Sequence, residues 1–232
     1  MKKKNSKIAL LVQCRLSSTR LKNKILLKIN KKYVLDYFIA RALVINVDEI
    51  IFIIANEKNN FKILQVLKKN PQIKYYIGSK LNVLKRTYFA AKKFNINTIV
   101  RITSDCPIFD PRLVNDGIKI FEKKNIDYVS NNLKKTWPHG LDFEIFSFKV
   151  LSHAFSRAKS KYDLEHVTPF IKRSKICKKY NILNNVNIYN KYRWTLDTKD
   201  DFSFFTNLLI KKKDLLTNFN WKKIKKFVDR NF

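Results

Sequence analysis

A basic loop near the start of the sequence carries the groups that bind phosphates in proteins. It covers residues 13–24 as QCRLSSTRLKNK and directly follows an apolar run over residues 8–12. Backbone amides and Ser/Thr hydroxyls donate hydrogen bonds to phosphate oxygens, arginine binds them in bidentate fashion, and lysine acts as a point charge. The loop could therefore wrap a triphosphate, although it lacks the GxxxxGK pattern of a P-loop. An ordinary surface loop is the alternative, because 49 of the 232 residues are lysine or arginine.

Arginine is more informative than lysine in this chain. Only ten arginines occur, and four of them lie in or beside polar clusters at the ends of predicted strands: Arg15, Arg20, Arg101 and Arg193. Planar, bidentate contacts to phosphate or carboxylate matter most at such places. Taken alone, these positions leave phosphate binding and a plain surface role equally open.

Two aspartates at predicted strand ends could hold a divalent cation. Asp105 lies in RITSDCP, directly after an apolar strand, and Asp197 lies in RWTLDT. Mg²⁺ takes hard oxygen ligands, usually one or two carboxylates completed by water and substrate phosphates. The alternative is that Asp197 or Thr198 caps the following helix, which is the commoner role for an aspartate in that position. Both roles can coexist through different oxygens.

A third polar cluster places two of the three histidines near carboxylates. His139 begins the stretch HGLDFE, and His166 follows Glu165 in EHVT. A carboxylate can fix the tautomer of a histidine, and such a pair can bind sugar hydroxyls or move a proton. Ordinary polarity at turns and helix ends would produce the same spacing, so this cluster leaves both readings open.

The composition indicates a folded protein with a basic surface. Hydrophobic residues make up 45% of the chain and aromatic residues 13%, which is enough for a packed core. A formal net charge of +31 would ordinarily suggest a nucleic-acid or anionic-membrane partner. The excess is lysine spread along the whole chain, without a clustered stripe or a recognition motif. We therefore expect a solvated basic surface and no specific nucleic-acid partner.

The apolar runs and the cysteines indicate the cellular compartment in which the protein functions. No apolar run approaches the roughly 18 residues that a membrane span needs, so we expect no membrane span and a cytoplasmic protein. Cys14, Cys106 and Cys177 are widely spaced and form no CxxC pair. We expect them to be free thiols.

The first half of the chain alternates short β-branched runs with segments of helical period. This pattern predicts an α/β fold with a doubly wound, mixed but mostly parallel sheet. Strands are predicted at residues 8–12, 49–55, 74–77, 98–102 and 127–130. Helices are predicted at residues 34–44, 59–69, 82–94 and 111–124, the last with Asp110 as N-cap and Pro111 in its first turn. Ligands of such sheets bind at the carboxyl ends of the strands, where the polar clusters lie.

The pattern changes after Asn131. A loop leads to a strand-like stretch at residues 141–146, a helix to about residue 158 and another near Asp163. We interpret residues of about 131–190 as a small substrate-side insertion in a single domain that spans residues 1–232. A strand at residues 192–196 and helices at residues 200–210 and 221–228 complete the prediction.

Read together, the clusters resemble a known family. QCRLSSTRLKNK is similar to the QARxxSTRLPGK loop of the spore-coat polysaccharide protein F and acylneuraminate cytidylyltransferase family. The resemblance continues in family order through GSKLNVLKR, RITSDCP, DYVSNN, HGLDFEIFS, EHVTPFI and RWTLDT, and covers residues from about 8 to 205. It implies a Rossmann-like nucleotidyltransferase sheet, which agrees with the alternation of elements.

The resemblance implies a role for each cluster. The catalytic residues would be Arg15, Lys24, Asp105 and Asp197, with Asp105 and Asp197 as the ligands of Mg²⁺. The nucleotide-binding residues would be Gln13, Arg15, Ser18, Arg20, Lys24, Asn82, Arg101 and Ser104. Sugar recognition would fall to His139, Asp142, Glu144, Glu165, His166 and Arg193.

The sequence departs from the family pattern in two of these motifs. Lys22 and Asn23 replace the Pro and Gly before the loop lysine, and Asn82 replaces the Asp of the DVL motif. Asparagine tolerates a left-handed turn, so we expect the loop to keep its shape. The loss of the acid at Asn82 puts a base or ribose contact in doubt and leaves the metal site untouched.

The expected reaction is transfer of CMP from CTP to an acidic 2-keto sugar for surface polysaccharide synthesis, with release of pyrophosphate. One alternative keeps the fold and changes the sugar, the sugar phosphate or the nucleotide. Another is a catalytically degenerate basic module that binds polyanions with a steep salt dependence. The resemblance also favours a homodimer.

Overall fold

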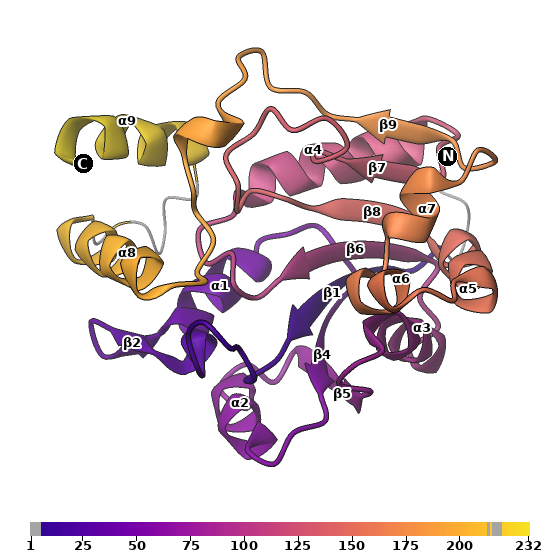
Figure 1. Ribbon diagram of the computed structural model, residues 1–232, viewed down its shortest axis with the longest axis horizontal. Coiled ribbons are helices and arrows are strands. Elements are labelled where there is room, and N and C mark those ends of the chain that lie inside the picture. The colour runs from indigo at the N-terminus through magenta and orange to yellow at the C-terminus, as the bar shows by residue number, and fades with distance from the viewer. Residues whose placement is uncertain (1–5, 213, 215–219) are drawn as a thin grey trace.

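A seven-stranded mixed sheet forms the centre of the computed structural model, which describes residues 6–212, 214 and 220–232 (Figure 1). The strand order is β5-β4-β1-β6-β8-β7-β9. Their bounds are β1 Ile8–Cys14, β4 Glu49–Ala55, β5 Ile73–Gly78, β6 Thr98–Thr103, β7 Tyr128–Ser130, β8 Glu144–Ser147 and β9 Lys179–Asn181. Strands β5, β4, β1 and β6 are parallel, whereas β8 runs antiparallel to its neighbours β6 and β7. Strand β1 is central because its apolar run can be buried on both faces.

Helices cover both faces of the sheet, as side-chain alternation along β1 requires. Leu10 and Val12 join a core with α1, α2, α4, α8 and α9, whereas Ala9 and Leu11 join a core with α3, α5 and α7. The helix bounds are α1 Val34–Ala42, α2 Asn60–Leu67, α3 Val83–Lys93, α4 Pro111–Lys123, α5 Phe148–Arg157, α6 Lys161–His166, α7 Pro169–Arg173, α8 Lys199–Lys211 and α9 Trp221–Asn231. Within the described residues, no helix is long and apolar enough to cross a lipid bilayer.

Three short elements complete the fold. A hairpin joins β2 Lys28–Ile29 to β3 Lys32–Tyr33, with Asn30 and Lys31 in its turn at φ of 50° and 63°. Positive φ at both turn residues suits the twist of a two-residue hairpin. The other two are the 3₁₀ helices η1 Lys24–Leu26 and η2 Tyr189–Lys191.

The structure confirms the predicted fold class and most predicted elements. Asp110 caps α4 through a bond from Arg112 N, and Pro111 is in its first turn. The three cysteines are buried free thiols. The strand predicted at residues 192–196 is wrong: this extended segment divides its backbone bonds between two loops and forms only an isolated bridge between Arg193 and His139. Strand β9 and the hairpin were not predicted, because each is only two or three residues long per strand.

Gly140 allows this extended segment to lie against the loop that contains His139. Trp194 N donates to His139 O at 2.6 Å, and His139 N donates to Tyr192 O at 3.2 Å. Gly140 has φ of +110°, and a Cβ there would lie 2.2 Å from the backbone oxygen of Trp194. Only glycine fits, both for its conformation and for the close approach of two backbones.

We predict that Gly140→Ala lowers the free energy of unfolding by about 3 kcal/mol, because it adds a backbone clash to an unfavourable conformation. Urea denaturation measures the change. Asn95→Ala is the matched control, since Asn95 is exposed at φ of 54° and its replacement should cost only about 1 kcal/mol. Equal effects of the two substitutions would show that the close approach to Trp194 does not limit this position.

Candidate active site

A cleft of about 1400 Å³ opens at the edge of the sheet where β1, β4 and β6 end. Its walls include Arg15 after β1, Asn56 after β4 and Asp105 after β6. The carboxyl ends of parallel strands are where α/β sheets bind ligands. The volume exceeds the roughly 300–1000 Å³ of common ligand pockets, so the cleft has room for more than one small substrate.

The ammonium group of Lys24 lies between two carboxylates at the base of this cleft. Lys24 Nζ is 2.6 Å from Asp105 Oδ2 and 2.8 Å from Asp197 Oδ1. The lysine side chain is 8% exposed, and those of Asp105 and Asp197 are 26% and 16% exposed. Two arginines contact the other oxygen of Asp197: Arg20 at 3.1 Å and Arg193 at 2.9 Å. The two predicted metal ligands therefore converge on one point, at which a cationic group already sits.

Mutual attraction keeps Lys24 and Asp197 charged. Burial alone would lower the pKa of Lys24, but Asp105 and Asp197 outweigh burial and raise it above its ordinary value. Burial alone would raise the pKa of Asp197, but Lys24, Arg20 and Arg193 outweigh burial and lower it. At neutral pH both groups are ionised.

Backbone bonds bring Asp197 to Asp105 from a distant part of the sequence. Leu196 N donates to Asp105 O at 2.8 Å, which fixes the extended segment beside the end of β6. The cap of helix α8 is Thr198, whose hydroxyl accepts from Asp201 N, while Asp201 accepts from the backbone of Thr198 in return. This capping box satisfies the helix N-terminus without the carboxylate of Asp197. Asp197 is thus left to face the cleft.

Glu57 holds the first loop in shape. One oxygen of its carboxylate accepts from Leu16 N at 2.8 Å and from Ser17 N at 3.2 Å. Asn23 stands at φ of 53° and donates from its backbone to Leu16 O, which closes the loop just before Lys24. The left-handed conformation expected where the family has glycine is therefore present, and asparagine supplies it.

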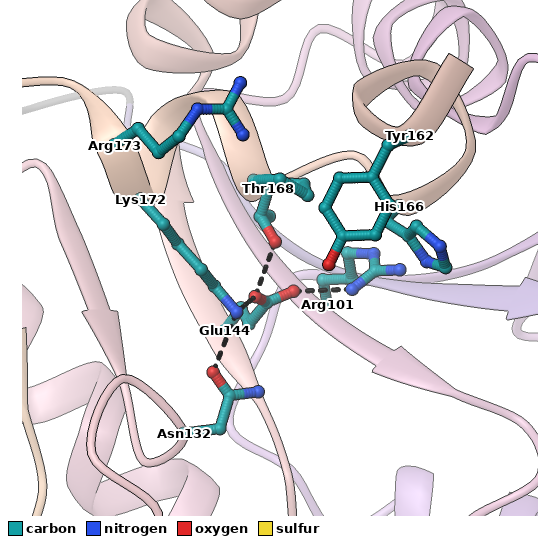
Figure 2. A pocket seen from close by; sticks show the side chains of 9 residues that line it. Arg101, Asn132, Glu144, Tyr162, His166, Thr168, Lys172 and Arg173 are labelled. Carbon is teal, nitrogen blue, oxygen red and sulfur yellow. Dashed lines mark hydrogen bonds and ion pairs between the residues drawn. The ribbon is translucent and has the colours of Figure 1, made fainter. Parts of the chain in front are cut away.

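Arg101 lies on the wall between this cleft and a second cavity of about 430 Å³ (Figure 2). Its guanidinium donates to Gln13 Oε1 at 2.6 Å and to Glu144 Oε2 at 2.5 Å. Gln13 belongs to β1 and Glu144 to β8, the two strands on either side of β6. Neighbouring strands thus fix the orientation of an arginine that lines both cavities.

Glu144 is a buried carboxylate that binds groups from several elements. Besides Arg101, it contacts Lys172 Nζ at 2.9 Å and accepts from the hydroxyls of Tyr128 and Thr168, each at 2.7 Å. Burial alone would raise the pKa of Glu144, but Arg101 and Lys172 lower it to about 2. Removing either cationic partner of such a buried carboxylate is destabilising, because part of its charge is then left uncompensated.

The structure gathers most of the predicted site residues around the larger cleft. Those that line it are Arg15, Ser18, Arg20, Lys24, Arg101, Asp105, His139, Asp142, Glu165, His166 and Asp197. Arg15 and Glu165 approach each other at 3.8 Å across the cleft mouth.

Five predicted residues, all of them in the described part of the chain, do not line the larger cleft. Gln13 binds Arg101, Ser104 donates from its backbone to Gln13 O, and Arg193 binds Asp197 and Asp201. The side chain of Asn82 caps α3 by accepting from Lys85 N at 2.7 Å. Glu144 lines the smaller cavity instead.

Glu57, Lys172 and Tyr162 are among the wall residues that sequence reasoning missed. Glu57 lies two positions after β4, so the rule that pointed to Asp105 could have found it. Lys172 and Tyr162 line both cavities. No sequence signal distinguished Lys172 from the many other lysines, because its partner Glu144 is brought to it only by the fold.

The donor set at the base of the cleft fits a magnesium ion. No cluster of three or more His, Cys, Asp or Glu able to hold a metal occurs among the described residues. Mg²⁺ often uses only one or two carboxylates and completes its octahedron with water and substrate phosphates. Asp105 and Asp197 meet this requirement, since the position of Lys24 Nζ shows that both can reach one cation.

The family model described as cytidylyltransferase matches residues 9–218. The chain belongs to the cytidylyltransferase family. It is 34% identical over 228 residues to the uncharacterized protein MJ1063 of Methanocaldococcus jannaschii, covering 97% of this chain and 91% of that protein. It is 26% identical over 203 residues to the spore coat polysaccharide biosynthesis protein SpsF of Bacillus subtilis, covering 84% and 83%. The recognised family and the enzyme class, a nucleotidyltransferase, are thereby confirmed.

Solved structures agree with this assignment. A cytidylyltransferase from Leptospira borgpetersenii has a TM-score of 0.90 and 26% identity, covering 98% of this chain and 95% of that chain. A CMP:2-keto-3-deoxy-manno-octonic acid synthetase complexed with CTP has a TM-score of 0.64 and 13% identity, covering 89% and 100%. Rv0371c of Mycobacterium tuberculosis in complex with manganese has a TM-score of 0.60 and 15% identity, covering 87% and 99%. The last two are similar to this cytidylyltransferase in fold.

We predict that Glu144 stabilises the fold at neutral pH and loses this effect in acid. Its folded pKa of about 2 lies below the ordinary 4.5, so its contribution is complete above about pH 4.5 and disappears as the pH falls toward 2. Urea denaturation of wild type and Glu144→Gln should differ by about 3 kcal/mol at pH 7, and by less than half of that at pH 3.

The control for this experiment is Glu122→Gln, at an exposed position on α4. Its difference from wild type should be small at both pH values. A difference for Glu144→Gln that stays constant from pH 7 to pH 3 would contradict the buried ion cluster.

Proposed function

We propose that this cytidylyltransferase transfers CMP from CTP to an acidic 2-keto sugar destined for surface polysaccharide. The observation that carries the proposal is the convergence of Asp105 and Asp197 on one cation position beside the basic first loop. The acidic sugar is supported by the relative that takes part in spore coat polysaccharide biosynthesis and by the fold shared with a 2-keto-3-deoxy-manno-octonic acid synthetase.

The reaction needs positioning and charge neutralisation rather than a nucleophilic side chain. The hydroxyl oxygen of the acceptor attacks the α-phosphorus of CTP in line, the bond to the β-phosphate breaks, and pyrophosphate leaves with the hydroxyl proton released. Mg²⁺ held by Asp105 and Asp197 would neutralise charge on the phosphate oxygens. Three basic residues that line the cleft, Arg15, Arg20 and Lys24, would bind the triphosphate and stabilise the leaving pyrophosphate.

Lys24 has two roles in this scheme. Without substrates its ammonium occupies the position between Asp105 and Asp197, and so prevents the repulsion that two adjacent carboxylates would otherwise suffer. When the nucleotide binds with its metal ion, the lysine moves to the phosphates that enter the same cleft. A divalent cation is supported by the manganese complex of the structurally similar Rv0371c.

We predict that Asp105→Asn lowers the rate of CTP-dependent pyrophosphate release by about 10³-fold or more, because it removes charge at the centre of the reaction. The assay uses Mg²⁺ with each nucleoside triphosphate against a panel of acidic and neutral sugars. Asp116→Asn is the control, since Asp116 lies exposed on α4 and, among the described residues, forms an ion pair with Lys119. Retained turnover in Asp105→Asn would overturn the metal assignment.

We also predict that Lys24→Met strengthens the binding of Mn²⁺ in the absence of nucleotide, because the ammonium no longer competes for the two carboxylates. Removing charge-assisted hydrogen bonds should lower the dissociation constant by about tenfold or more, as measured by isothermal titration calorimetry. Lys22→Met, an exposed residue of the same loop, should leave the constant unchanged. Unchanged or weaker binding by Lys24→Met would show that Lys24 does not occupy the metal position.

A further inference from the structure

The smaller cavity opens beside the proposed CTP cleft and shares part of its wall. Arg101, Asn132, Tyr162, His166 and Lys172 line both cavities. A volume of about 430 Å³ is within the range of small-molecule sites. The two cavities are therefore direct neighbours.

The walls of the smaller cavity carry more positive than negative charge. Arg101 and Lys172 share the single carboxylate of Glu144. Arg173, which also lines the cavity, is paired at 2.8 Å with Asp163. Three cations thus face two carboxylates, and the cavity complements a ligand with one negative charge.

Among the described residues, the ammonium group of Lys172 has one N–H donor left that can bind a ligand. An ammonium group has three N–H bonds. Lys172 directs one to Glu144 Oε1 at 2.9 Å and one to Asn132 Oδ1 at 3.0 Å, so within the described residues one is left for a ligand. Figure 2 shows Lys172, Thr168 and Arg101 converging on Glu144, which fixes the ammonium at the cavity wall.

The opposite wall presents groups of the kind that can bind a sugar. Tyr162 is 61% exposed, and the centroid of its ring lies 4.6 Å from that of the His166 ring. Both side chains line the cavity (Figure 2). An exposed ring offers an apolar face, and the phenol hydroxyl and imidazole offer hydrogen bonds to a polyhydroxylated ligand.

A strained backbone turn shapes this wall. Val167, between His166 and Thr168, has φ of 70° and ψ of −54°, and Thr168 N donates to His166 O at 2.8 Å. These values define a γ-turn of the rare, strained type, in a β-branched residue. The turn buries Val167 completely and leaves His166 and Thr168 on the cavity wall. Such strain is commonly found at binding sites.

We propose that the smaller cavity is the binding site of the sugar acceptor and that Lys172 binds the carboxylate of that acceptor. The inference rests on the proposed function and adds the place and the residue that select an acid. Glu144 and His166 of this cavity are among the residues to which the family resemblance assigns sugar recognition, whereas Lys172 is not.

The test compares Lys172→Met with wild type, using 2-keto-3-deoxy-manno-octonic acid, N-acetylneuraminic acid and the carboxamide of each. Pyrophosphate release with CTP and Mg²⁺ gives the KM of each acceptor and of CTP, and isothermal titration calorimetry gives binding of each acceptor. The matched control is Lys175→Met, which removes an exposed lysine three residues further along.

Loss of a charge-assisted hydrogen bond should raise the KM for the acid by about tenfold to a hundredfold and leave the KM for CTP within about twofold. Wild type should prefer the acid over its carboxamide, and Lys172→Met should not. A general loss of structure would not remove this preference selectively.

Two other outcomes are distinguishable. If an acid is a substrate and Lys172→Met leaves its KM and the preference over the carboxamide unchanged, the inference is wrong and the proposed function stands. If wild type neither binds nor uses any acid but uses a neutral sugar, both the acidic acceptor and the role of Lys172 are wrong.

Discussion

The contact of one ammonium group with two carboxylates determines how this site is built. Asp105 lies two residues after strand β6, Asp197 comes from an extended segment late in the chain, and Lys24 closes the first loop. Two carboxylates this close together repel each other unless a cation lies between them. Lys24 supplies that cation within the chain itself, so the arrangement that the proposed magnesium ion and triphosphate require would exist before either one binds. Preorganisation of this kind lowers the free-energy cost of assembling a charged site during the reaction.

A second cluster of ionised groups, around Glu144, also joins distant segments of the chain through opposite charges. Glu144 draws Arg101 from the central sheet and Lys172 from a short helix to one buried point. The two clusters lie on opposite sides of the cleft wall, and Arg101 lines the cavity on each side of it. The chain has a net charge of +31, and the few carboxylates at these two points fix the positions and orientations of the basic side chains around them.

The sequence was sufficient for the elements with strong local signals and insufficient for those made by tertiary contacts. Long apolar strands and amphipathic helices were predicted within a few residues, because burial imposes their periodicity. Asp105 and Asp197 could be singled out, but only the structure shows that Thr198 caps helix α8 and leaves Asp197 to the cleft. Residues 192–196 are typical of a strand because apolar and polar residues alternate in them, yet their backbone bonds to two separate loops. Lys172 could not be found, since nothing in the sequence links it to Glu144.

The position of the metal ion tests the central claim most directly. A crystal structure of the protein with CTP and Mn²⁺, with the anomalous signal of manganese measured, locates the ion without reference to any assumed ligand. The account predicts a manganese peak bound by Asp105 and Asp197 and by phosphate oxygens of CTP, with Lys24 moved from between the carboxylates to the triphosphate. A manganese ion bound elsewhere, with Lys24 still bridging Asp105 and Asp197 beside bound CTP, would contradict it.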